Sequence, residues 1–316
     1  MNPNSPTTAV APMAPLRAET ASTVEPPIET PDSLVANIRE MFTELWASRE
    51  LLWQMTVRDL KLRYKQSLMG FGWAILMPLL IVCAGCLVRA AMAHVAGESL
   101  QVKDVAAMVV KAIPWAFFVG SVSFAVVSLT SNLNLVTKIY FPREVFPFSA
   151  VLTQAVDSAV GIAALVALMA LAGIGVTWAA LWFIPLTIML FLFTAGVCLL
   201  LACGNLFFRD VKYLVQLLLN FGVFFTPVFY EPINLGNLFG GLMLLNPLTG
   251  ILEGFRLSVI EGHSLTTTIM QIDHHRAGFV TWSPDYLLYS GVWAVGLFAF
   301  AWYLFHKLEF IYAEYI

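Results

Sequence analysis

The side chains best placed to do chemistry are few in this 316-residue chain. One carboxylate, Asp157, lies well inside an apolar segment, with Gln154 one helical turn before it. An acidic group at membrane depth is costly and normally faces a cavity or the interior of a helix bundle. We therefore expect Asp157 either to line a polar passage or to hydrogen-bond to a neighbouring helix, and the sequence leaves both alternatives open.

The histidines and cysteines do not form a recognisable catalytic or metal-binding pattern. One polar segment holds four candidate ligands: His263, Asp273, His274 and His275. They lack the H-E-x-x-H spacing of a zinc protease, so a solvated loop is the expectation. Cys83 and Cys86 form a C-x-x-C pair inside an apolar run and are expected to be packing residues. The sequence predicts no catalytic residue, no metal and no cofactor bound by this chain.

The chain also lacks a nucleotide-binding loop. No lysine follows a glycine anywhere in the sequence, so the phosphate-binding pattern G-x-x-x-x-G-K-[ST] is absent. If this protein moves cargo with ATP, a separate chain must bind the nucleotide and its magnesium ion.

The composition is that of a membrane protein. Hydrophobic residues make up 59% of the chain and charged residues 12%, and the mean hydropathy is +0.79. Soluble domains carry about a quarter charged residues, so lipid must solvate part of this apolar surface. The net charge of −3, with no strongly basic domain, argues against a nucleic-acid partner.

Six apolar segments are long enough to cross a bilayer, because a membrane-spanning helix needs about 20 apolar residues. They cover residues 71–92, 113–133, 148–172, 178–203, 213–230 and 286–305. The sequence therefore predicts an all-α membrane protein with six transmembrane helices.

The region before the first span divides into two parts. Residues 1–31, rich in Pro, Thr and Ala, are expected to be a disordered cytoplasmic tail; residues 32–316 are expected to be the transmembrane domain. The apolar residues from Leu34 to Trp46 recur at helical period opposite a charged face. This pattern predicts an amphipathic helix lying flat in the membrane interface, with packing against a soluble partner as the alternative.

Cations set the expected orientation. Arg58, Lys61, Arg63 and Lys65 directly precede the first span, and a basic cluster beside an apolar span marks the cytoplasmic side. If the chain crosses the membrane six times from that cytoplasmic cluster, the connections with the higher cation density lie on the cytoplasmic side. Both termini are then expected in the cytoplasm.

The long outer connection over residues 231–285 is too apolar in its first part for an ordinary loop. It contains two G-x-x-x-G patterns, of which one is Gly250 to Gly254, and these permit close helix approach. Asn246-Pro247 breaks the segment in the middle. We expect two short re-entrant helices that close a passage, because broken backbone at membrane depth must be buried in protein or line a cavity.

Two connections on the inner side combine aromatic residues with paired charges, a mixture enriched in binding hot spots. They cover residues 138–147 and 205–212. Docking of a partner is one interpretation of both segments, and anchoring at the inner membrane surface is the other.

Five motifs, in order over about residues 50 to 260, resemble the permease subunit of polysaccharide ABC exporters. They are Arg58-Asp-Leu-Lys-Leu-Arg-Tyr-Lys-Gln-Ser67 with Gly70, Trp73 and Pro78; Val136-x-Lys138-x-Tyr140-Phe-Pro-Arg143; Asn205-x-x-x-Arg209-Asp-Val-Lys-Tyr213; Thr226-Pro-Val; and Asn246-Pro-Leu-x-Gly-x-x-Glu253-Gly-Phe-Arg256. The tail before Asp32 and the segment from His263 to Trp282 match no motif of that family.

The resemblance implies a homodimer in the bacterial inner membrane that exports a lipid-linked O-antigen, capsule or teichoic-acid chain. It implies two ATPase subunits that carry ATP and Mg, docked on Tyr140, Phe141, Pro142, Arg143, Glu144, Arg209 and Asp210. It implies an interface helix that leads into the first span through Arg58, Asp59, Arg63 and Tyr64. It also implies an outer gate that includes Asn246, Pro247, Glu253 and Arg256.

Aromatic residues are candidates to line the passage together with Asp157, because sugars stack on aromatic faces. The candidates are Phe117, Phe118, Phe124, Phe221, Phe224, Phe225 and Tyr230, and lipid-facing packing is the alternative for each.

Two other functions remain open from the sequence. One is a secondary carrier or channel without an ATPase, and the other is a membrane-embedded transferase that acts on lipid-linked sugars.

Overall fold

The computed structural model describes residues 34–65, 72–96, 101–133, 135, 142–171, 173–230, 236–273 and 276–315. Two of the predicted docking residues, Tyr140 and Phe141, lie outside these ranges, as does the predicted tail over residues 1–31.

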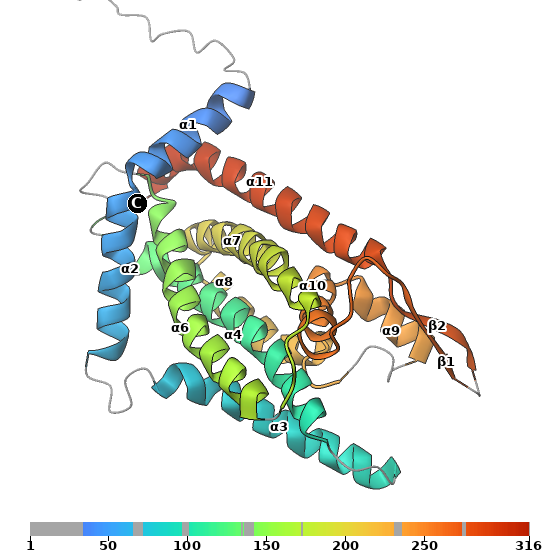
Figure 1. The fold of residues 1–316 in the computed structure, drawn as a ribbon. Coiled ribbons are helices and arrows are strands. Elements are labelled where there is room, and N and C mark those ends of the chain that lie inside the picture. Colours follow the sequence, from blue (N-terminus) through green and yellow to red (C-terminus); the bar gives the residue numbers. More distant parts are fainter. Residues whose placement is uncertain are drawn as a thin grey trace, which may run out of the picture.

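The described chain is a bundle of helices with one small β-hairpin (Figure 1). In chain order the elements are α1 (Leu34–Ala47), α2 (Arg49–Tyr64), α3 (Gly72–Ala96), α4 (Val102–Ser131), α6 (Val145–Leu171), the 3₁₀ helix η1 (Trp178–Trp182), α7 (Phe183–Phe207), α8 (Val211–Phe225), α9 (Gly236–Leu244), α10 (Pro247–Phe255), the π-helix η3 (Arg256–Ile260), β1 (Ile269–Asp273), β2 (Arg276–Trp282) and α11 (Pro284–Tyr315).

Four helices of the described chain are long and apolar enough to cross a membrane. They cover Val102–Ser131, Val145–Leu171, Trp178–Phe207 and Pro284–Leu308. The other two predicted spans differ from each other: α3 has 25 residues with no charged residue before Arg89, whereas α8 has 15 residues. At 1.5 Å per residue α8 is about 22 Å long, less than the hydrocarbon thickness of about 30 Å. It ends because Thr226 is extended and Pro227 follows.

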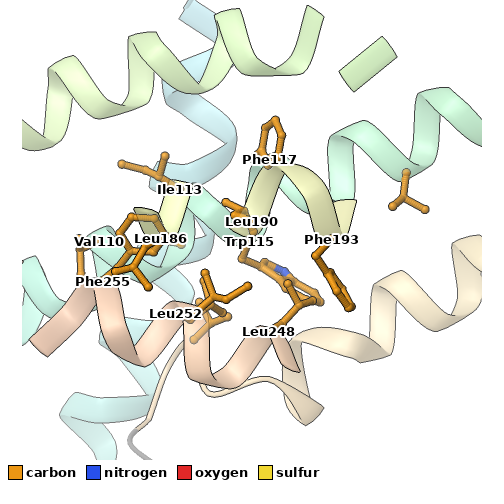
Figure 2. Close-up of a cluster of buried hydrophobic side chains, with 14 of the residues drawn as sticks. Val110, Ile113, Trp115, Phe117, Leu186, Leu190, Phe193, Leu248, Leu252 and Phe255 are labelled. Atoms are coloured by element: carbon orange, nitrogen blue, oxygen red, sulfur yellow. The ribbon is translucent and has the colours of Figure 1, made fainter. Parts of the chain in front are cut away.

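Helix α4 lies at the centre of the bundle, between α6 and α7, and α11 packs on α7. Figure 2 shows buried side chains of α10 gathered with those of α4 and α7 in one cluster of this core. The side chains labelled there are Val110, Ile113, Trp115 and Phe117 from α4, Leu186, Leu190 and Phe193 from α7, and Leu248, Leu252 and Phe255 from α10.

Two glycines of α10 allow this close packing. A Cβ at Gly254 would lie 2.9 Å from Cδ2 of Leu186, and a Cβ at Gly250 would collide with Oγ of Ser290 on α11. The spacing that predicted a close helix approach therefore corresponds to real contacts, made with α7 and α11.

The apolar stripe of α1 has a mixed environment. Met41 is 3% exposed and belongs to a second cluster with Phe146 at the start of α6 and Trp302 and Phe305 in α11. Trp46 on the same helix is 72% exposed. Helix α1 thus packs partly on its own bundle, beside the C-terminal half of α11 (Figure 1).

The described chain is mostly helical, as expected, and a small β-hairpin is added to the helices. Strands β1 and β2 pair antiparallel, with Ile269 opposite Trp282. The sequence of β2 contains Phe279, Val280 and Thr281, residue types that favour strands. The Trp282 indole is fully buried in the main core cluster and donates a hydrogen bond to the carbonyl oxygen of Leu265, in the loop before β1, at 3.1 Å.

Candidate functional site

A cavity of about 680 Å³ opens where α2 meets the bundle. Helices α2, α3, α4, α6 and α8, and the segment after α8, all contribute to its wall. Its aromatic residues are Trp73, Trp115, Phe124 and Phe229, and its polar residues are Arg63, Tyr64, Gln154, Asp157, Ser158 and Asn220. A concave site with aromatic walls and a few convergent polar groups is typical of ligand-binding pockets.

The polar wall is built on Asp157. Its side chain is 6% exposed and forms an ion pair with Nη1 of Arg63, and the hydroxyl of Tyr64 donates to its other oxygen. Nη1 of Arg63 also donates to Oε1 of Gln154 at 3.1 Å. A bond to a neighbouring helix, one of the two alternatives for Asp157, is therefore present, and the same carboxylate lies on the wall of this cavity.

Arg63 is held on its other side by an aromatic ring. Its guanidinium carbon lies 4.0 Å from the ring centroid of Phe124 on α4, within the range of a cation–π contact. The end of α2 is therefore fixed to α6 by charge and to α4 by stacking.

Tyr64 acts as a hydrogen-bond donor in this site. Burial raises the pKa of its hydroxyl to about 12, and the neighbouring Asp157 carboxylate adds to the increase. The phenol therefore stays protonated and uncharged at physiological pH.

A smaller pocket of about 270 Å³ shares Arg63 and Phe124 with the first cavity. In it Asp59 pairs with Arg58 at 2.8 Å, and Oγ of Ser149 on α6 donates to Asp59 at 3.3 Å. Nη2 of Arg58 donates to Oδ1 of Asn132, just after α4, at 3.2 Å. The residues expected to lead from the interface helix into the first span, Arg58, Asp59, Arg63 and Tyr64, thus all join α2 to the α4 and α6 region.

Only two of the predicted lining residues, Asp157 and Phe124, lie on the larger cavity. Phe117 stacks on Phe191 with ring centroids 6.5 Å apart, and Phe118 contacts Phe193 at 6.1 Å. These two rings pack against the core. The sequence missed Trp73, Trp115 and Phe229, because in helices that are apolar all round the sequence does not say which face meets a cavity.

The remaining predicted lining residues lie on or after α8. Phe221, Phe224 and Phe225 are 54%, 61% and 69% exposed. The hydroxyl of Tyr230 donates to the carbonyl oxygen of Phe224 at 2.5 Å. None of the four lines the larger cavity.

The predicted docking residues have different environments. Arg209 and Asp210 are exposed in the turn between α7 and α8, and Pro142 and Arg143 are half-buried before α6. Glu144 is 1% exposed, which differs from the exposed position expected of a docking residue. Its Oε1 accepts a hydrogen bond from Nε1 of Trp302 at 3.2 Å, and Nδ1 of His306 lies 3.5 Å from it. The C-terminal half of α11 covers this carboxylate. The contact could not be predicted from the sequence, because the two segments are far apart along the chain.

The predicted gate residues form a cap and a charge cluster. Asn246 caps α10, accepting a hydrogen bond from the backbone N–H of Leu248 at 3.1 Å, with Pro247 in the first turn. Nε of Arg256 donates to Oε1 of Glu253 at 2.9 Å, and both side chains are at least nine-tenths buried.

Further charges connect this pair to α4. Glu261 lies 3.3 Å from Nη1 of Arg256 and 2.8 Å from Nζ of Lys103. Lys111, 2% exposed, donates to the carbonyl oxygen of Tyr230 at 2.8 Å. Lys111 has no role among the sequence-based expectations, although a lone cation in an apolar helix is a signal of a specific partner.

Burial and the neighbouring charges act on Glu253 in opposite directions. Burial alone would raise the pKa of its carboxyl, but the charges of Arg256 and Lys111 lower the pKa below its usual value.

No group of three His, Cys, Asp or Glu side chains that could hold a metal occurs among the described residues. His274 and His275 lie outside those residues.

Comparison with known proteins shows which family this chain resembles. The profile of the ABC-2 type transporter family matches residues 50–260. The O-antigen export system permease protein RfbA of Klebsiella pneumoniae is 28% identical over 215 residues, which cover 67% of this chain and 81% of the relative. RfbA of Myxococcus xanthus, with the same description, is 29% identical over 220 residues, which cover 69% and 83%. Together with its long apolar helices, the family match identifies this chain as an integral membrane protein of the ABC-2 type transporter family.

Proposed function

We propose that this chain is the transmembrane subunit of an ATP-driven exporter that moves a lipid-linked polysaccharide of O-antigen, capsule or teichoic-acid type across the bacterial inner membrane. The observation that carries this proposal is the cavity bounded by Trp73, Trp115, Phe124 and Phe229 on one hand and by Gln154, Asp157 and Asn220 on the other. Sugar rings present apolar C–H faces to aromatic rings and hydroxyls to polar groups, so such a wall suits a glycan.

The relatives support the same substrate class. Two of them are described as permeases of O-antigen export systems and align with more than four-fifths of their length. The proposal extends that description to this chain.

The energy for transport comes from a partner in this proposal. The chain has no G-x-x-x-x-G-K-[ST] loop, and an ABC-2 permease implies an ABC ATPase. Two ATPase subunits, which carry ATP and Mg, dock on the connections around Arg143 and around Arg209 and Asp210. When ATP draws the ATPases together, these connections move and open a passage between two permease copies.

The proposed topology has six crossings with both termini in the cytoplasm. Helix α3, with 25 residues, and the α8 segment, with 15, complete the set of six with the four long spans. Helices α1 and α2 lie at the cytoplasmic surface, in line with the cluster from Arg58 to Lys65. Helices α9 and α10 are re-entrant and form the outer gate with Asn246, Pro247, Glu253 and Arg256.

Exchanging both Arg209 and Asp210 for alanine is expected to lower glycan export at least tenfold, because both side chains are exposed and would contact the ATPase. The measurement is co-purification of the candidate ATPase with the permease, together with ATPase activity and export in cells.

The matched control is the double exchange of Arg49 and Glu50 for alanine, a neighbouring opposite-charge pair that is also exposed and lies outside the proposed docking segments. It should leave complex and export intact. Full complex formation and full ATPase activity in the Arg209/Asp210 variant would rule out the docking role.

A further inference from the structure

The charges around the larger cavity are balanced one for one. Among the described residues that line it, the ionisable side chains are Arg63, Tyr64 and Asp157. Arg63 and Asp157 form an ion pair with each other, and Tyr64 is a protonated phenol that donates to the same carboxylate. The described wall thus carries one positive and one negative charge in direct contact.

The adjoining pocket follows the same rule. It adds one ionisable residue, Asp59, to the shared Arg63. Asp59 is paired with Arg58 at 2.8 Å. Arg58 is not on the wall of either pocket, but its direct contact with Asp59 offsets that charge, so the described wall residues together with Arg58 carry no net charge.

A cavity wall on which each charge is already paired disfavours the binding of charged ligands. A carboxylate or ammonium group that leaves water loses its hydration, and this loss is recovered only if an opposite charge is available to pair with it. Here each cation already has its carboxylate, and a ligand carboxylate would have to compete with Asp157 for Arg63. An uncharged sugar meets no such cost, because aromatic rings and the side-chain amides of Gln154 and Asn220 lie along the same wall.

We propose that this cavity binds uncharged sugar residues and discriminates against acidic ones. This inference rests on the proposed export function and narrows its substrate class from glycans in general to glycans with neutral repeats. It also holds for a homodimer, because a second copy brings the same residues, and hence the same balance, to a shared passage.

The local charge can be measured at a cysteine introduced as Ser158→Cys, on the cavity wall, in a chain with Cys83 and Cys86 changed to alanine. Cys198 and Cys203 are buried and can stay. Two thiosulfonate reagents are compared in the permease–ATPase complex: one carries a cationic trimethylammonium group and the other an anionic sulfonate group. The rate at which each reagent modifies the cysteine is divided by its rate of reaction with a free thiol in solution. We expect the two normalised rates to agree within about twofold, since balanced charges cancel.

Three variants test the origin of that agreement. Asp157→Asn leaves Arg63 uncompensated and should favour the sulfonate reagent by on the order of tenfold, and Arg63→Gln should favour the trimethylammonium reagent similarly. The double variant Arg63→Gln/Asp157→Asn breaks the same contact but keeps zero net charge, so its rates should agree again. A strong bias in the parent chain, or no bias in Asp157→Asn, would overturn the inference.

The glycan preference is then tested by protection of the same cysteine against a neutral thiosulfonate. The probes are a mannotetraose and a tetragalacturonate, which differ in charge. The neutral tetrasaccharide should protect at a concentration at least tenfold lower, and Asp157→Asn should narrow that gap. Equal or better protection by the acidic probe would overturn the neutral selectivity while leaving export of a glycan in place. Protection by neither probe would count against glycan binding in this cavity, and the ATPase-docking test decides separately whether the exporter function survives.

Discussion

The Arg256→Ala variant is expected to lose about 3 kcal/mol of stability, because it leaves the Glu253 carboxylate buried without its main partner. Glu253 is 3% exposed and receives a hydrogen bond from Nε of Arg256 at 2.9 Å. Thermal unfolding of the purified protein in detergent, followed by the loss of monodisperse material, measures the change.

Lys103→Ala is the matched control at the other end of the same charge cluster. The side chains of Lys103 and Glu261 are 51% and 35% exposed, and exposed ion pairs contribute at most about 1 kcal/mol. The control should unfold close to the parent temperature. Equal melting temperatures for the two variants would show that the buried pair does not stabilise the fold.

The effect should also depend on pH. The pKa of Glu253 is lowered in the folded protein, since the attraction of Arg256 and Lys111 outweighs the opposing effect of burial. A carboxyl with a lowered folded pKa stabilises the fold above its unfolded pKa, and this contribution is lost as the pH falls through the folded value. The difference between parent and Arg256→Ala should therefore be full at neutral pH and shrink in acid.

The second large effect is expected from Gly196→Val, at the crossing of α7 and α11. A Cβ at Gly196 would lie 3.0 Å from both Cα and N of Phe298. These are backbone atoms, which cannot rotate away, so the two helices would have to separate. Overpacking of a close contact costs about 3 kcal/mol at its upper range, and we expect a large loss of folded protein.

Gly296→Val provides the matched control, because Gly296 lies in α11 and a Cβ added there would meet no atom within 4 Å. Both substitutions replace a helical glycine by the same β-branched residue, so the difference between them isolates the helix contact. The amount of membrane-inserted monodisperse protein and its melting temperature are the measurements. If both variants behave alike, the tight crossing of α7 and α11 is wrong.

The membrane class and the family could be predicted from the sequence because they depend on composition and on local motifs. Long apolar segments need no knowledge of their neighbours, and the motifs from Arg58 to Arg256 lie within the stretch that matches the ABC-2 family. Asp157 could be singled out for the same reason, since a carboxylate in an apolar segment is costly wherever it lies.

The lining of the cavity could not be predicted in this way. Trp115 lines the larger cavity, whereas Phe117, two residues later on α4, packs against Phe191. Both are aromatic residues in an apolar helix, and the difference between them is the direction each faces in the bundle. Glu144 likewise was predicted to be an exposed docking residue, but α11, which lies more than 150 positions later in the sequence, covers its side chain.

By itself the sequence determined that this chain is a membrane protein without a nucleotide-binding loop, because hydropathy and a missing motif are properties of short segments. The tertiary structure alone decided that the cavity wall is electrically balanced. Arg63 and Asp157 are 94 positions apart, and a charge is neutralised by whatever lies against it in space. That partner is set by the packing of α2 on α6.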